Sequence, residues 1–234
     1  MDVDDDRIKE TVKHTEILRA PKQSLYTFGT TSIYYYMVTE PVYAELVKTT
    51  NETVIREGRV IAEKPRIVTP YYLANLEGFS SEARKYFEAE MQGYGANIRG
   101  LFYTYKNEPK EPTIVSDSLP SVVDKINTEI DQRGDPLAAI IKGQDELWDV
   151  SLIKFIYEVT KSSLQDNLRQ LGSRGLLNID TAGIPLDARL RIDELFEKVV
   201  AGESDPDELK RELDRWGLFK EYEDRFFNIF RKVR

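Results

Sequence analysis

The sequence predicts an α+β protein, with a mostly antiparallel sheet and one packed helix near the N-terminus and a helical bundle near the C-terminus. Short runs of β-branched and aromatic residues separated by turn residues fill the segment 17–109, which is typical of strands. Apolar residues spaced three and four apart dominate 119–234, which is typical of amphipathic helices. We therefore expect two domains joined near 107–118.

Composition excludes several kinds of chemistry. The chain has 234 residues, of which 41% are hydrophobic and 11% aromatic, and this is enough for a packed core. It contains no cysteine, so disulfides, cysteine-ligated zinc and thiol nucleophiles are excluded. The net charge is −8 and no segment is strongly basic, which disfavours electrostatic binding of nucleic acid. No secretory leader or membrane-spanning run is visible, so we expect a cytoplasmic protein without a membrane partner.

The first sixteen residues hold six acidic and three basic side chains. This charge predicts an acidic flexible arm over 1–16, or a short frayed helix. His14 is the only histidine and lies in this arm, so a histidine-based triad or metal site would have to be built there. We expect no metal and no catalytic histidine.

The segment 24–43 is the densest run of strand-forming residues, and we expect its central strand at 31–39 to be covered on both faces. Side chains alternate along a strand, so Tyr34 and Tyr36 share one face while Tyr35 lies on the other. The remaining strands are expected at 25–28, 43–49, 53–62, 66–69, 98–106 and 113–115. The packed helix is expected at about 80–92, capped by Ser80 or Ser81.

The C-terminal part predicts a series of helices with recognisable ends. Gly134 ends the first of them, and Asp135-Pro136 indicates the start of a second helix that continues toward Lys142. Asp205 followed by Pro206 is a strong helix start. The predicted helices are 120–133, 135–142, 145–161, 164–171, 185–201, 206–216 and 219–234.

The segment Val159-Thr-Lys-Ser-Ser-Leu-Gln-Asp-Asn-Leu-Arg-Gln-Leu171, followed by Gly-Ser-Arg-Gly-Leu-Leu, resembles the second half of a winged helix-turn-helix module over 147–177. Glu158 stands where that motif has a turn glycine, and the segment carries no basic patch. The resemblance implies a DNA-reading helix or a protein-docking module. Its nucleic-acid contacts would be Ser162, Gln165, Arg169 and Arg174.

Other motifs of enzymes are missing from the sequence. There is no phosphate-binding loop and no dinucleotide fingerprint, so we expect no cofactor and identify no catalytic residue. Exposed tyrosines on the sheet could still bind a ligand. The candidate ligand surface consists of Tyr34, Tyr36, Tyr103 and Tyr105.

Three functions follow, and whether the protein is an enzyme stays open. The favoured one is a non-enzymatic binding or interaction protein, because no catalytic constellation stands out in the sequence. The last helix carries apolar side chains on more than one face, which suits packing on its own domain and, as the second interpretation, a protein partner or a homodimer. The first alternative is a winged-helix-like transcriptional regulator. The second is a hydrolase that uses carboxylates and tyrosines at the sheet face.

Overall fold

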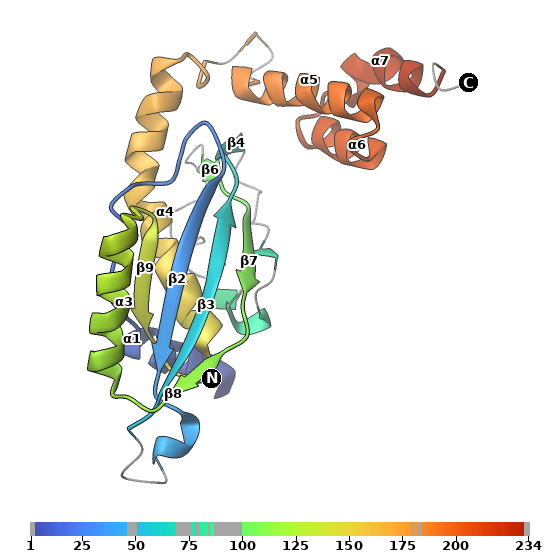
Figure 1. The fold of residues 1–234 in the computed structure, drawn as a ribbon. Helices are drawn as coiled ribbons and strands as arrows, with labels where there is room; N and C mark the ends of the chain where they lie inside the picture. The colour runs from blue at the N-terminus through green and yellow to red at the C-terminus, as the bar shows by residue number, and fades with distance from the viewer. Residues whose placement is uncertain are drawn as a thin grey trace. The chain divides into compact units, whose positions relative to one another are not determined.

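The computed structural model describes residues 3–45, 51–68, 76–77, 80–83, 85–86, 100–178, 180–181 and 184–231. Within these residues the chain has the predicted α+β fold (Figure 1). It divides into two compact units, Met1–Leu168 and Arg169–Arg234. We refer to them as the sheet unit and the C-terminal unit.

A seven-stranded sheet forms the centre of the sheet unit, with strand order β1-β9-β2-β3-β7-β5 and with β8 also paired to β3. Most pairs are antiparallel, but β2 and β9 are parallel neighbours, and so are β5 and β7. A separate two-stranded sheet contains β4 and β6. The strands are β1 Glu16–Arg19, β2 Thr31–Thr39, β3 Thr53–Ala62, β4 Arg66–Val68, β5 Leu76–Glu77, β6 Gly100–Phe102, β7 Tyr105–Pro109, β8 Thr113–Val115 and β9 Ala138–Lys142.

Strand β2 is the central strand that its sequence predicts. It pairs along its whole length with β3 and, from Tyr34 to Val38, with β9. Tyr35 and Met37 are almost completely buried on one face, and Tyr36 is buried on the other. The hydroxyl of Tyr35 is 3.0 Å from the side-chain oxygen of Asn107 on β7, so the buried phenol has a partner.

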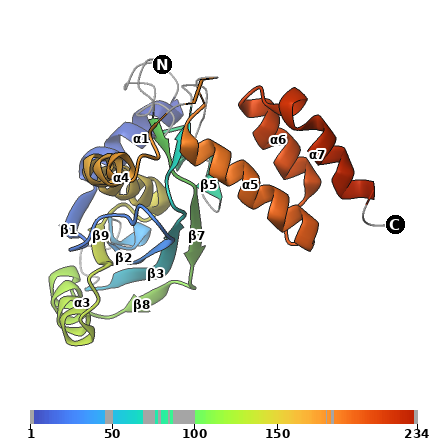
Figure 2. The same ribbon diagram turned by 90° about the horizontal axis from the view of Figure 1, so that it is seen from above.

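Helices cover the two faces of the sheet (Figure 2). On one face lies α3, Leu119–Arg133, whose Ile126 packs in a cluster with Tyr36 and Ile140. The opposite face is covered by α4, Trp148–Ser173, where Trp148 stacks on Tyr35 with ring centroids 6.5 Å apart. The alternation of buried side chains along β2 is therefore explained by one helix layer on each side.

The N-terminal segment is helix α1, Val3–His14, where the sequence predicts a flexible arm or a short frayed helix over 1–16. Thr11 is completely buried and Ile8 nearly so, three residues apart on one side of the helix. The ammonium group of Lys154 on α4 donates to the backbone carbonyls of Val12 and Thr15, at 3.1 and 2.9 Å. Charged residues dominate the composition of this segment, so its composition does not reveal the buried stripe of Ile8 and Thr11.

The segment 135–142 contains a strand, β9, and the prediction of a helix there is wrong. Asp135 does not start a helix; its carboxylate accepts a hydrogen bond from the backbone N–H of Leu137, which makes a turn. Because β9 lies between β1 and β2, with one helix layer on each face of the sheet, Ala138 to Ile141 are all buried. A strand buried on both faces has a continuous apolar run instead of alternation, so its periodicity does not distinguish it from a helix.

Helix α4 is continuous over 26 residues, where the sequence predicts two helices. The hydroxyls of Ser162 and Ser163 donate to the carbonyl of Val159, at 2.9 and 2.7 Å. These bonds keep both serines inside the helix, so they do not cap a new one. With no turn near Glu158, the winged helix-turn-helix resemblance over 147–177 does not hold.

Three further predictions differ in detail. No strand forms at 25–28, where the backbone N–H of Tyr26 bonds instead to the hydroxyl of Thr31. The predicted strand 43–49 begins as a short 3-10 helix, η1 Val42–Glu45, and the rest lies outside the described residues. Ser80 caps a helical turn, since its hydroxyl accepts from the N–H of Ala83, but most of the predicted helix 80–92 lies outside the described residues.

The C-terminal unit contains the predicted helical bundle. Its helices are α5 Leu186–Ala201, α6 Pro206–Arg215 and α7 Phe219–Arg231. The Asp205 carboxylate caps α6 by accepting from the N–H of Asp207 at 2.8 Å, and Gly217, with φ of 66°, separates α6 from α7. The unit begins after Leu168, however, because α3, β9 and most of α4 cover or complete the sheet and belong to the sheet unit. The predicted division into domains 17–109 and 119–234 therefore differs from the observed units.

Candidate functional site

The four tyrosines of the predicted ligand surface do not form one surface. The side chain of Tyr34 is 45% exposed, whereas Tyr36 is buried beside α3 and its hydroxyl accepts from Arg133 at 2.7 Å. Tyr103 and Tyr105 face α4 on the other side of the sheet, with hydroxyls 3.1 Å from the amide of Asn167 and 2.5 Å from the hydroxyl of Thr160. Burial raises the pKa of both phenols. They are core residues, and only Tyr34 is open to solvent.

The predicted nucleic-acid contacts Ser162, Gln165, Arg169 and Arg174 are all exposed, the first three on α4 and the last just after it. The structure does not supply the preceding helix and turn that would present them to a groove. Contact with nucleic acid through these residues stays a prediction that nothing tests.

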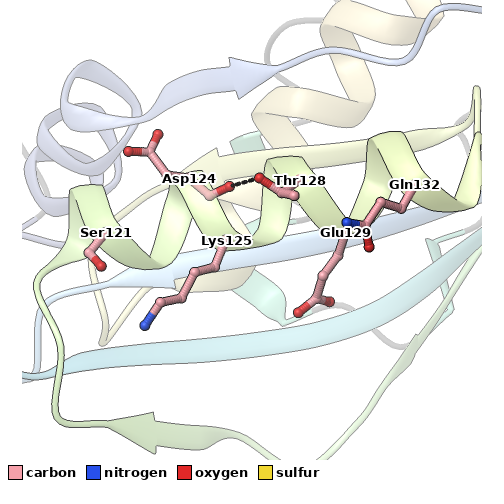
Figure 3. A pocket seen from close by; sticks show the side chains of 6 residues that line it. All are labelled: Ser121, Asp124, Lys125, Thr128, Glu129 and Gln132. Atoms are coloured by element: carbon pink, nitrogen blue, oxygen red, sulfur yellow. Dashed lines mark hydrogen bonds between the residues drawn. The ribbon is translucent and has the colours of Figure 1, made fainter.

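A hollow of about 620 Å³ runs along the outside of α3 (Figure 3). The six polar residues that line it all come from this one helix. Lys125 pairs with Asp117 at 2.6 Å, and Glu129 pairs with Arg133 at 3.4 Å. A single helix flank with two of its three charged groups already paired is a solvated surface, and we assign it no binding role.

A second hollow lies at the end of the sheet where β2 and β9 both finish, and we call it the strand-end pocket. Both strands point to this end of the sheet (Figure 1). Its volume is about 530 Å³, and three segments line it: 7–14 of α1, 40–42 after β2, and 142–147 from the last residue of β9 to the start of α4. Ligands of α/β proteins commonly bind outside the carboxyl ends of parallel strands, which is this position.

Hydrogen bonds fix the walls of the strand-end pocket. The hydroxyl of Thr11 donates to the side-chain oxygen of Gln144 at 2.6 Å, and Arg7 pairs with Glu146 at 2.7 Å. The hydroxyls of Thr15 and Ser151 are 2.7 Å apart, which joins the end of α1 to the first turns of α4. The pocket therefore has walls held together by contacts between segments that are more than 130 residues apart.

A part-buried ion pair stands beside the strand-end pocket, which Asp145 lines. The Asp145 carboxylate accepts from Thr39 at 2.8 Å and from Arg56 at 2.5 Å, and both charged side chains are less than one fifth exposed. The guanidinium of Arg56 also lies over the ring of Trp148, 5.7 Å from its centroid. This network ties the ends of β2 and β3 to the loop before α4.

The predicted absence of a role for His14 depended on a flexible arm, and the structure places His14 on the wall of the strand-end pocket. Its Nδ1 is 2.8 Å from the carbonyl of Glu10, and the Glu10 carboxylate is 3.4 Å away. Sequence reasoning missed the whole pocket. The only local signal was the spacing of Glu10, His14 and the apolar residues of α1 along one helix.

The C-terminal unit presents a different feature, an aromatic ridge on α7 formed by Phe227 and Phe230. Phe226, beside them, is buried in the core of the unit. The side chains of Phe227 and Phe230 are 48% and 49% exposed, although both make edge-to-face contacts with Phe226 at 5.7 and 5.6 Å. Large apolar rings that stay half exposed on a small unit are typical of contact surfaces.

Comparisons with protein-family models, with curated proteins and with solved structures find nothing that matches this chain. Among the described residues, no cluster of three or more histidine, aspartate or glutamate side chains is arranged to hold a metal ion. In the same part of the chain, no helix combines the length and the apolar composition needed to cross a membrane.

Proposed function

We propose that this is a non-enzymatic interaction protein, which docks a second copy of itself through the aromatic ridge of α7. The observation that carries the proposal is the half-exposed pair Phe227 and Phe230. Removing the rest of each ring from water would bury roughly 100 Å² of apolar surface, which contributes about 2 kcal/mol per ring. Two copies contribute four rings, enough to offset a substantial part of the cost of association.

The charges around the ridge favour a second copy as the partner. Glu223 and Asp224 precede the two phenylalanines and are exposed, while Arg231 and Arg234 follow them in the sequence. If two α7 helices pack antiparallel, Glu223 and Asp224 of one helix run alongside the end of the other, where Arg231 stands. An antiparallel pair centred between Phe227 and Phe230 also places Phe227 of each copy against Phe230 of the other, as a two-fold interface requires.

The oligomeric state of the full chain tests this proposal. Sedimentation velocity from low to high micromolar concentration should show a monomer–dimer equilibrium for the wild type. The variant Phe227→Ser/Phe230→Ser should raise the dimer dissociation constant at least about a hundredfold, because four rings lose their buried surface. Ile114→Ser is the matched control: Ile114 is 57% exposed on β8 of the sheet unit, and its loss should leave association unchanged.

Charge reversal tests the antiparallel arrangement. Glu223→Lys/Asp224→Lys and Arg231→Glu should each weaken association, because like charges then meet across the interface. An equimolar mixture of the two variants should recover a heterodimer. A wild type that stays monomeric throughout, or a phenylalanine variant that still dimerises, contradicts the proposal.

The two alternative functions have less support. A transcriptional regulator lacks the helix-turn-helix on which it depended, since α4 is continuous. A hydrolase that uses the sheet tyrosines would need accessible phenols, and those of Tyr103 and Tyr105 are buried and bonded to α4.

A further inference from the structure

The strand-end pocket has the properties of a small-molecule site, and nothing in the C-terminal unit is needed to form it. Its volume of about 530 Å³ lies in the range that small ligands occupy. Its walls come from three segments of the sheet unit, and the contacts of Thr11 with Gln144 and of Arg7 with Glu146 hold them in place. A site that is already formed loses little conformational entropy when a ligand binds.

Most charged groups in the strand-end pocket are already paired. Arg7 pairs with Glu146, Asp145 with Arg56, and Glu10 lies beside His14. Two charged residues that line the pocket are exceptions to this pairing. Within the described part of the chain, neither the side chain of Lys142 nor that of Glu40 makes a hydrogen bond or an ion pair, and the two do not pair with each other.

The parallel pairing of β2 and β9 brings these two residues to the same end of the sheet. Lys142 is the last residue of β9 and is in register with Val38 of β2. Glu40 comes two residues after Val38, just past the end of β2. The pocket thus contains one unpaired ammonium and one unpaired carboxylate, contributed by adjacent strands.

Two unpaired opposite charges in one pocket favour a ligand that carries both of the complementary charges. A cation alone would leave Lys142 unpaired in the pocket, and an anion alone would leave Glu40 unpaired, so each would satisfy half of the site. Pro41, Val42 and Leu147 line the same pocket and supply an apolar wall. Such a wall suits a short hydrocarbon group attached to the charged ends.

We propose that the strand-end pocket binds a small zwitterion of the α-amino acid class. The ligand carboxylate pairs with the ammonium of Lys142, and the ligand ammonium pairs with the carboxylate of Glu40. The side chain of the ligand lies against Pro41, Val42 and Leu147. The pairs of Arg7 with Glu146 and of Asp145 with Arg56 stay intact and hold the walls in place.

Calorimetric titration of the full chain tests the ligand class with three probes of similar shape. L-leucine carries both charges, 4-methylpentanoate carries only the carboxylate, and 3-methylbutylamine carries only the ammonium. We expect L-leucine to bind at least about tenfold more tightly than either analogue, since each missing charged hydrogen bond lowers affinity by that factor or more. A polar neutral compound, glucose, should give no heat.

Variants assign the charges. Lys142→Met should lower the affinity for L-leucine about tenfold or more and leave the weak binding of 3-methylbutylamine unchanged. Glu40→Gln should likewise lower the affinity for L-leucine and leave the weak binding of 4-methylpentanoate unchanged. Lys9→Met and Glu111→Gln are the matched controls, because both residues are exposed and neither lines the pocket. Lys142→Gln provides a second variant if Lys142→Met does not fold, as judged by circular dichroism.

Three results would overturn the proposal. The first is no heat from L-leucine, L-alanine or glycine at millimolar concentration. The second is equal affinity for L-leucine and either single-charge analogue. The third is unchanged affinity in both Lys142→Met and Glu40→Gln. None of these results depends on whether the chain dimerises, so the ligand class and the docking function fail separately.

Discussion

Gly58, in the middle of β3, is the position where a single added methyl group should most clearly disturb the core. A Cβ atom built there would lie 2.5 Å from Cζ and 2.8 Å from Cε1 of Tyr35. The Tyr35 ring is only 1% exposed, and its hydroxyl is bonded to Asn107, so it has little room to move. We therefore expect Gly58→Ala to force an overpacked arrangement of β2 against β3.

The magnitude follows from two opposing effects. Overpacking a filled core costs about 1–3 kcal/mol, and replacing glycine lowers the entropy of the unfolded chain, which returns about 0.4–1 kcal/mol. The net loss in unfolding free energy should be about 1–2 kcal/mol. In a Tyr35→Leu background the crowding atoms are absent, so Gly58→Ala should be neutral or slightly stabilising there. Tyr35→Phe keeps Cζ and Cε1, so the cost should persist in that background.

Urea unfolding measures these differences. Trp148 stacks on Tyr35 and reports on the sheet unit, and a Trp216→Phe background removes the other tryptophan signal. A double-mutant cycle then gives the coupling between positions 35 and 58. Equal costs of Gly58→Ala in the tyrosine and leucine backgrounds would refute the close-approach explanation.

Two further predictions concern pH and helix capping. Burial raises the pKa of Tyr35 to about 12, above its unfolded value near 10, so its contribution to stability is complete below about pH 10 and is lost as pH rises toward 12. The difference in tyrosinate absorbance between the wild type and Tyr35→Phe should therefore appear together with loss of circular dichroism, and a difference already present near pH 10 in the folded protein would contradict this. Asp205→Ala should cost about 1 kcal/mol and speed hydrogen exchange in α6 but not in β2, because the cap bond to Asp207 is lost.

Elements whose signals are local were predicted well. The bounds of β2 and β3 agree with their runs of β-branched and aromatic residues, and Asp205-Pro206 and Gly217 mark helix ends in both sequence and structure. In each case the residues that decide the conformation are neighbours in sequence. The same holds for Gly134, which ends α3 in the left-handed conformation.

The failures share the opposite property, because distant contacts decided the outcome. Ser162 and Ser163 look like a cap, but Ser163 lies in the core, where its hydroxyl also accepts from the backbone N–H of Leu25 at 3.0 Å. Ala138 to Ile141 are neutral between helix and strand until β1 and β2 pair on either side. No periodicity within a single segment contains that information.

The strand-end pocket could not be predicted for the same reason, and each error removed one of its walls. With 1–16 predicted as a flexible arm, the wall that contains Thr11 and His14 was absent from the predicted structure. Treating 135–142 as a helix removed the parallel neighbour of β2, so Lys142 and Glu40 stayed about a hundred residues apart with no reason to be compared. Once β9 pairs with β2 in parallel, the residues at the two strand ends come to the same end of the sheet. The ammonium and the carboxylate that define the proposed ligand are therefore a consequence of strand order, the property that local sequence determines least.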